Sequence, residues 1–138
     1  MNRVVLDLNV LVSARISPNG APAALLSAWV DGAFELVVFE QLLHDLEAVL
    51  SRPKFRRYFD EREAADYVSV LRRWAVVAPE PDDVPNVTPD PEDDRLVALA
   101  TSAGARVLVS GDAHLHGLAG TGPVVKSPGE LLLILSSP

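Results

Sequence analysis

Apolar residues along the chain fall into short continuous runs and into longer stretches with helical spacing. Residues 4–12 form a nearly continuous, β-branched apolar run, which predicts a strand covered on both faces, as in a parallel sheet. Shorter runs predict further strands at residues 34–38, 75–78, 106–110 and 124–126. Helical spacing predicts helices at residues 23–30, 40–50, 60–71 and 91–103, and a last helix through the apolar run 131–135. The alternation predicts an α/β fold with a mainly parallel sheet and helices on both faces.

Three of these helices carry sequence signals for their first residues. Asp60 with Glu63, and Ser127 with Glu130, have the spacing of a capping box, in which each side chain bonds the backbone of the other. Asp90 stands before a proline, the usual order of an N-cap and a first helical residue. These signals favour the helix assignments independently of the apolar spacing.

Size and composition limit the classes of protein to consider. The 138 residues, 49 % of them apolar, predict one domain spanning residues 1–138. The absence of cysteine leaves no disulfide framework and no cysteine-based zinc site. We see no signal-peptide pattern, and the longest apolar run is far shorter than the roughly 20 residues of a membrane span. A cytoplasmic protein without a membrane segment is therefore expected.

The charge of the chain is unevenly distributed. Twelve basic and 19 acidic residues give a formal net charge of −7, which argues against a generally basic nucleic-acid surface. Acidic residues concentrate between positions 80 and 94. The basic cluster, which is the best candidate for holding an RNA backbone, comprises Arg52, Lys54, Arg56 and Arg57. The alternative interpretation of this cluster is ordinary solvated surface charge.

Several acids are predicted to meet at one edge of the sheet. Asp7 lies within or near the end of the first strand, and Asp112 follows the fourth, so both point to the carboxyl edge where ligands bind in such sheets. Asp45 lies beside the apolar stripe of its helix, and Glu47 flanks the other side as a rival. The sequence therefore predicts a cluster of carboxylates at this edge. It leaves open whether Asp45 or Glu47 is the member contributed by the helix at 40–50.

The helix at 91–103 adds a further acid. Asp93 shares the inward face of this helix, whereas Asp94 is predicted to face solvent; a first-turn acid that stabilises the helix dipole is the alternative for Asp93.

Two unit charges about 4 Å apart repel by about 4 kcal/mol at an effective dielectric near 20, so a cluster of carboxylates implies protonation or a bound cation. Oxygen ligands favour Mg²⁺ or Mn²⁺, which could bind a phosphodiester and activate water.

Four acidic segments follow one another along nearly the whole chain. In chain order they are VVLDLNVLVSA, LLHDLEAVLSRPKF, DPEDDRLVALA and VLVSGDAHL. Together they resemble the PIN-domain family, especially toxins of toxin–antitoxin pairs related to VapC ribonucleases. The resemblance implies a three-layer α/β/α sandwich with four to five strands and Mg²⁺- or Mn²⁺-dependent cleavage of RNA. It implies catalytic roles for Asp7, Asp45, Asp93 and Asp112, of which Asp7, Asp93 and Asp112 would bind the metal.

The resemblance also implies supporting residues and partners. Asn9 matches the family's D-x-N pattern, Ser110 matches its small hydroxyl residue before the last acid, and Asp94 adjoins Asp93. The family precedent favours a homodimer and, for a toxin, a cognate antitoxin. The apolar run 131–135 is expected either to be wholly buried or to pack on a second subunit or partner.

Three residues depart from the family pattern. Leu8 replaces a usual Thr or Ser, Phe39 replaces a common helix-capping Ser, and Asp45 replaces the usual Glu. Leu8 and Asp45 keep open an alternative function, a PIN scaffold that is catalytically weak or inactive and works as a binding module. An aspartyl-nucleophile phosphatase is a further alternative, but its second acid is missing because Asn9 occupies that position.

Overall fold

The computed structural model describes residues 2–82, 84, 86, 90–111 and 123–136, and its centre is a parallel sheet of five strands. The strands are β1 (Arg3–Leu6), β2 (Glu35–Val38), β3 (Val76–Val77), β4 (Val107–Val109) and β5 (Val124–Lys126). Their order is β3-β2-β1-β4-β5, and every neighbouring pair is parallel. The predicted parallel sheet of four to five strands is confirmed.

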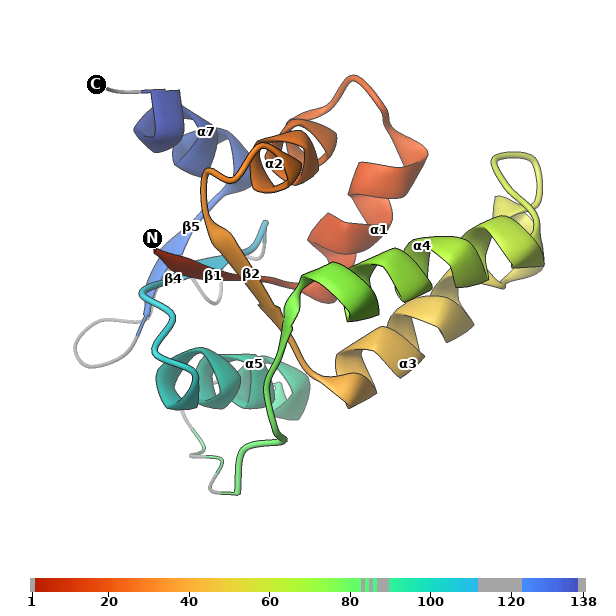
Figure 1. Cartoon of the computed structure of the whole chain (residues 1–138). Helices are drawn as coiled ribbons and strands as arrows, with labels where there is room; N and C mark the ends of the chain where they lie inside the picture. The colour runs from red at the N-terminus through yellow and green to blue at the C-terminus, as the bar shows by residue number, and fades with distance from the viewer. Residues whose placement is uncertain (1, 83, 85, 87–89, 112–122, 137–138) are drawn as a thin grey trace.

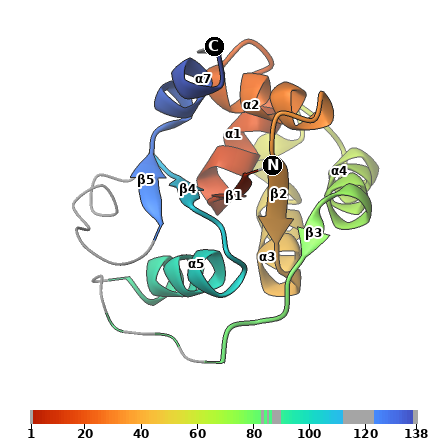
Figure 2. The same cartoon turned by 60° about the vertical axis from the view of Figure 1, so that its left-hand side comes forward.

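Helices cover both faces of the sheet, so the predicted three-layer arrangement is also confirmed. The helices are α1 (Leu8–Ile16), α2 (Ala21–Val30), α3 (Glu40–Leu50), α4 (Glu61–Trp74), α5 (Pro91–Ser102) and α7 (Pro128–Ser136), with a short 3₁₀ turn at Pro53–Phe55. Figure 1 shows α1, α2 and α7 on one side of the sheet and α5 on the other, with the α3–α4 pair beside α1. The view in Figure 2 shows the same separation of α7 and α2 from α5.

The prediction of one long strand over residues 4–12 is wrong. β1 ends at Leu6, and Asp7 is the N-cap of α1, which begins at Leu8. A short apolar run does not distinguish a buried strand from a buried helix, because neither leaves a polar face. The polar residue inside the run marks the change from strand to helix, since an aspartate side chain can bond the free N–H groups of a first helical turn.

The predicted helix starts agree with the structure. Asp60 and Glu63 form a complete capping box at the start of α4. Ser127 and Glu130 form the same reciprocal pair at α7, with N···O distances of 2.8 and 3.2 Å. The helix predicted at residues 40–50 coincides with α3. Local capping chemistry therefore fixes these boundaries where apolar spacing alone would leave them uncertain by a turn.

Strand residues with no solvent contact form the centre of the core. On β1 and β2 the completely buried residues are Val5, Leu6, Leu36, Val37 and Val38. The α7 helix is only partly buried: Leu131 lies in the core, whereas Leu133 is 71 % and Ile134 is 51 % exposed. The apolar run of α7 is thus not wholly buried. Within the described part of the chain, no helix has both the length and the apolar character to cross a membrane.

Candidate functional site

Buried polar side chains of the described residues gather at one edge of the sheet. Asp7 is 7 % exposed, Asp94 is 4 % exposed and Ser110 has no exposure; among the described residues, they are the buried polar or charged ones. Asp7 follows β1, Ser110 follows β4, and Asp94 lies in the first turns of α5, the helix that leads into β4. Because all three stand at the carboxyl ends of adjacent strands or at the start of the packed helix, they define a candidate site there.

Asp7 is held by backbone bonds on both sides. Its N–H donates to the carbonyl oxygen of Val109 at 3.0 Å, which ties it to β4. Its Oδ1 accepts the N–H of Val10 at 2.9 Å, the capping bond of α1. The positive end of the helix dipole also favours a negative charge at this position. The local fold therefore fixes the Asp7 side chain at the carboxyl edge of the sheet.

On α5 the predicted orientation of Asp94 is wrong. Asp94, expected to face solvent, is buried, and Asp93, expected to face inward, is half-buried. The reason is that residues 96–100 are all buried, so this part of α5 has no side that faces solvent. A helical projection therefore cannot tell which of the two acids is the more exposed. Since α5 packs on β1 and β4, its first turns bring Asp94 to the same sheet edge as Asp7.

Asp45 lies in the middle of α3 and lines a small cavity between helices. The cavity has a volume of about 40 Å³ and is lined by Leu8, Phe39, Leu42, Asp45, Arg95 and Leu96. The Asp45 Oδ1 accepts a hydrogen bond from Gln41 Nε2 at 2.8 Å. Glu47, its rival, is exposed. The cavity joins the starts of α1 and α5 to α3, so Asp45 is near the residues adjoining Asp7 and Asp94.

The remaining predicted site residues are placed as follows. Asn9 is exposed in the first turn of α1. The Ser110 N–H donates to the Lys126 carbonyl oxygen at 2.9 Å, which joins β4 to β5. Asp112 lies outside the described residues. Within the described ranges, no three His, Cys, Asp or Glu side chains stand close enough to hold a metal ion. The donors gathered here are oxygens, which fit a hard cation.

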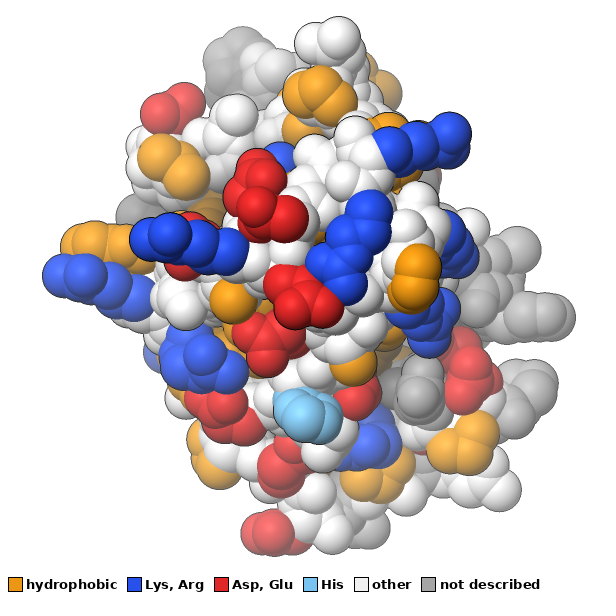
Figure 3. Space-filling model, turned by 90° about the vertical axis from the view of Figure 1, so that its right-hand side faces the viewer, with side chains coloured by type: hydrophobic (Ala, Val, Ile, Leu, Met, Phe, Trp, Pro, Cys, Tyr) orange, Lys and Arg blue, Asp and Glu red, His pale blue; other side chains and the backbone are white. Residues whose placement is uncertain are grey.

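The predicted basic cluster lies at the far end of α3. Arg52, Lys54, Arg56 and Arg57 are all exposed. Arg52 follows Asp45 by seven residues, about 10 Å along a helix axis at about 1.5 Å per residue. Arg56 Nη2 lies 2.6 Å from Glu61 Oε1. Figure 3, which views this side of the molecule, shows acidic side chains interspersed with Lys and Arg instead of a continuous basic surface.

Arg95 is a charged residue of the site region that the sequence reasoning missed. Its Nη2 donates to Glu80 Oε2 at 3.1 Å, and its Cζ lies 5.6 Å from the ring centroid of Phe39. The available signal was its position, since it is a cation that directly follows the run of acids between residues 80 and 94. Apolar periodicity gives no sign of such contacts, because they join three separate segments.

The fold is that of a PIN domain. The PIN domain family model matches residues 3–114, and the chain belongs to this family. PIN domains are generally nucleases, and these nucleases usually use divalent metals. The identification made from the four acidic segments is therefore confirmed.

Two individual proteins illustrate the relationship. The chain is 26 % identical to an uncharacterized protein of Methanocaldococcus jannaschii over 117 residues, which are 84 % of this chain and 74 % of that protein. It also resembles a chain of VapBC2 from Rickettsia felis, solved bound to a DNA fragment from their promoter. That match has a TM-score of 0.63 at 10 % identity and covers 91 % of this chain and 98 % of the other. At this identity the second comparison concerns the fold alone.

Proposed function

We propose that the protein is a Mg²⁺- or Mn²⁺-dependent endoribonuclease that hydrolyses RNA phosphodiester bonds, and that it is the toxin of a toxin–antitoxin pair. The observation that carries the proposal is the position of the buried polar residues Asp7, Asp94 and Ser110 at one sheet edge of a PIN domain. PIN domains are generally nucleases that use divalent metals, and carboxylates at this edge are the ligand type that Mg²⁺ and Mn²⁺ prefer. The position of these acids in a PIN domain therefore supports a metal-dependent nuclease.

Each acid has a proposed role. Asp7, Asp93 and Asp112 would hold the ion, and Asp94 would support them from the position next to Asp93. Asp45 would orient the attacking water from the α3 side, and Asn9 and Ser110 would support the surrounding polar contacts. A bound divalent ion lowers the pKa of water and stabilises charge on the phosphate oxygens. The shorter reach of Asp45, compared with a glutamate, is expected to favour contact through water.

The decisive variant is Asp7→Asn. Asparagine is as good an N-cap as aspartate, so the bond to Val10 and the fold should persist while the charge is lost. We expect Mn²⁺-dependent cleavage of single-stranded RNA to fall by at least about 100-fold, a loss of roughly 3 kcal/mol in transition-state stabilisation. Gel assays of RNA cleavage with and without EDTA measure this effect. Asp31→Asn, at the exposed C-cap of α2, is the matched control and should cleave normally.

A stability measurement provides a readout independent of cleavage. Mn²⁺ binds only the folded site, so it should raise the melting temperature of the wild-type protein and of Asp31→Asn. Asp7→Asn and Asp94→Asn should show a smaller rise. Full cleavage by Asp7→Asn, or equal metal-induced stabilisation of all four proteins, would contradict the assignment.

The second candidate function is a binding module without catalysis. Leu8 places an apolar side chain in the cavity beside Asp45, and the Asp45 carboxylate is bonded to Gln41. A module of this kind should bind neither Mg²⁺ nor Mn²⁺ and should leave RNA intact. Metal titration by calorimetry, followed by the cleavage assay, separates the two functions.

The proposal includes protein partners. The VapBC2 structure pairs two proteins whose name marks them as a toxin–antitoxin complex, and this likeness supports a cognate antitoxin here.

The exposed Leu133 and Ile134 on α7 support a homodimer, because adjacent exposed apolar residues favour association. Sedimentation of the purified chain should give a dimer mass, and Leu133→Asp should shift it toward the monomer. A monomeric wild-type protein would exclude the homodimer.

A further inference from the structure

We propose that Arg95 binds a backbone phosphate of the RNA beside the acidic site, and that Glu80 competes with this phosphate for the guanidinium group. The inference rests on the proposed ribonuclease function and extends it to substrate positioning. It concerns a residue that is not one of the acids, and it depends on two contacts of Arg95 and on the cavity that it lines with Asp45.

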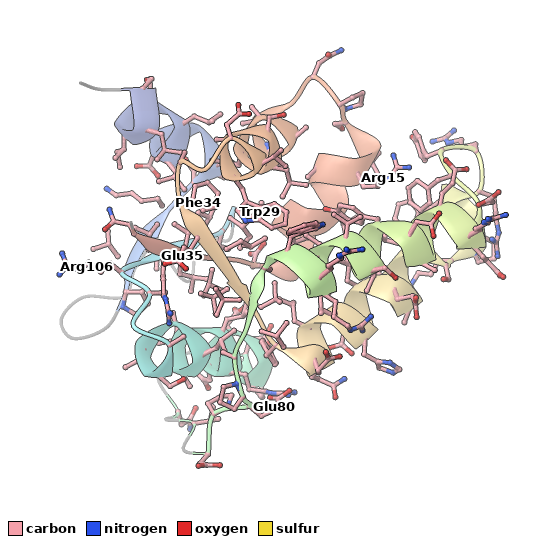
Figure 4. All side chains as sticks on the ribbon, viewed as in Figure 1. Arg15, Trp29, Phe34, Glu35, Glu80 and Arg106 are labelled. Carbon is pink, nitrogen blue, oxygen red and sulfur yellow. The ribbon has the colours of Figure 1, made fainter. Side chains whose placement is uncertain are left out.

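Arg95 reaches the site region from α5 and is held by two other segments. Its guanidinium lies against the face of Phe39, with Cζ 5.6 Å from the ring centroid, at the junction of β2 and α3. Its Nη2 donates to Glu80, which lies on the segment after β3; Figure 4 shows Glu80 beside α5. Stacking on Phe39 restricts the guanidinium plane and leaves its N–H edge available to an anion.

The position of Arg95 suits a phosphate contact. It follows the buried Asp94 directly in α5, and it lines the same small cavity as Asp45. RNA approaching several carboxylates is repelled, and a fixed cation at the rim offsets part of this repulsion. The cavity is small, at about 40 Å³, which is room for a few water molecules. The expected contact is therefore with a phosphate at the cavity mouth.

Glu80 is suited to act as a replaceable partner. The pair is partly exposed, with side-chain exposures of 38 % for Arg95 and 45 % for Glu80. Exposed ion pairs of this kind are weak, whereas Arg binds phosphate with several parallel N–H donors. Glu80 accepts from Nη2, so a phosphate can first meet other N–H groups of the same guanidinium and then displace the carboxylate. RNA binding would then exchange a carboxylate for a phosphate on a guanidinium that is already oriented.

The test is the salt dependence of RNA affinity. Binding of a fluorescein-labelled single-stranded RNA is measured by anisotropy between about 50 and 200 mM salt, a range over which phosphate contacts change affinity strongly. Ca²⁺ replaces Mg²⁺, and gels check that the RNA stays intact. Arg95→Ala should weaken binding roughly five- to tenfold and reduce the slope of log affinity against log salt by about 0.7, the value of one phosphate contact on a single strand.

Two further variants separate charge from folding. Arg95→Lys retains the charge and should recover most of the salt slope, even if the stacking on Phe39 weakens. Glu80→Gln should tighten binding about two- to fivefold, the size expected from loss of an exposed ion pair. In the Arg95→Ala background, Glu80→Gln should have no effect, because the competition requires the guanidinium. Thermal melts confirm that each variant is folded.

The opposite edge of the sheet supplies matched controls. Glu35 begins β2 and pairs with Arg3, and Arg106 is exposed just before β4; Figure 4 labels both Glu35 and Arg106. Glu35→Gln and Arg106→Ala change the net charge by the same amounts. The inference is overturned if Arg95→Ala binds no more weakly than Arg106→Ala, or if Glu80→Gln tightens binding no more than Glu35→Gln. A wild-type protein that neither binds nor cuts RNA overturns the proposed function as well.

Discussion

At the residue scale, one half-buried tyrosine hydroxyl connects two helices. Tyr67 on α4 donates to the carbonyl oxygen of Leu11 on α1 at 2.8 Å. Burial raises the pKa of Tyr67, and the nearby positive charge of Arg15 opposes this only in part. The phenol therefore remains a protonated donor at every physiological pH. The bond helps to hold α1, and with it the Asp7 cap, against α4.

Replacement of this hydroxyl should have a small and pH-dependent effect. Tyr67→Phe is expected to lower the free energy of unfolding by about 1 kcal/mol near neutral pH, through loss of one hydrogen bond. The folded-state pKa is raised, so wild-type stability should fall as the pH rises above about 10, where tyrosine in the unfolded chain ionises. The variant should lack this component of the alkaline loss. Urea denaturation at neutral and alkaline pH measures both effects, and equal alkaline loss in the two proteins would contradict the argument.

The residue types of the site could be predicted from sequence, but their orientations could not. Asp7, Asp45 and the acids of α5 were visible because carboxylates stood beside apolar stripes or at strand ends. The expectation that Asp94 faces solvent failed because α5 is buried on every side at residues 96–100. Arg95 was missed because its partners come from distant segments, and pairwise side-chain contacts leave no periodic signal.

At the scale of elements, α3 begins without a side-chain cap. Phe39 is its N-cap residue and makes no capping hydrogen bond, but it is only 4 % exposed. A capping serine would contribute about 1 kcal/mol. Removing a buried phenylalanine costs about 3–5 kcal/mol, and its contact with Arg95 adds roughly 0.5–1 kcal/mol. The free energy gained by burying Phe39 therefore exceeds the free energy that a capping serine would contribute. This explains why an aromatic residue is stable at the start of α3.

This comparison predicts the result of restoring the cap. Phe39→Ser should lower the free energy of unfolding by about 2–4 kcal/mol, despite the new capping bond. Asp60→Ala, which removes a complete capping box from α4, should lower it by only about 1 kcal/mol. Urea denaturation of both variants gives the two values. If Phe39→Ser were the more stable of the two, capping would outweigh burial at this boundary.

Element boundaries followed sequence signals where local chemistry decides them. The capping pairs at α4 and α7 bond within four residues, so their sequence spacing is sufficient to place the helix starts. The β1–α1 junction depends instead on whether residues 8–12 pair with a neighbouring strand or pack as a helix. That choice is made by tertiary contacts, and a continuous apolar run is compatible with either outcome.

At the scale of the whole molecule, the proposed function requires an acidic protein to bind a polyanion. The net charge of −7 opposes RNA binding at long range, and the basic cluster is partly neutralised by Glu61. If the cluster holds RNA, the double variant Arg56→Glu and Arg57→Glu should weaken binding and flatten its salt dependence, by up to about 0.7 in slope for each phosphate that is no longer neutralised. Anisotropy titrations at several salt concentrations measure this. Unchanged affinity and slope would restrict RNA binding to the sheet edge.

The junction of β1 and α1 places two separate demands on a single side chain. A cap for Val10 requires a short oxygen acceptor, which asparagine and serine also provide. Neutralisation of a cation requires a formal charge, which glutamate also carries, although its longer chain is a poor cap. Only aspartate meets both demands. We therefore expect that several residue types at position 7 still allow the protein to fold. Only aspartate at this position should also allow nuclease activity.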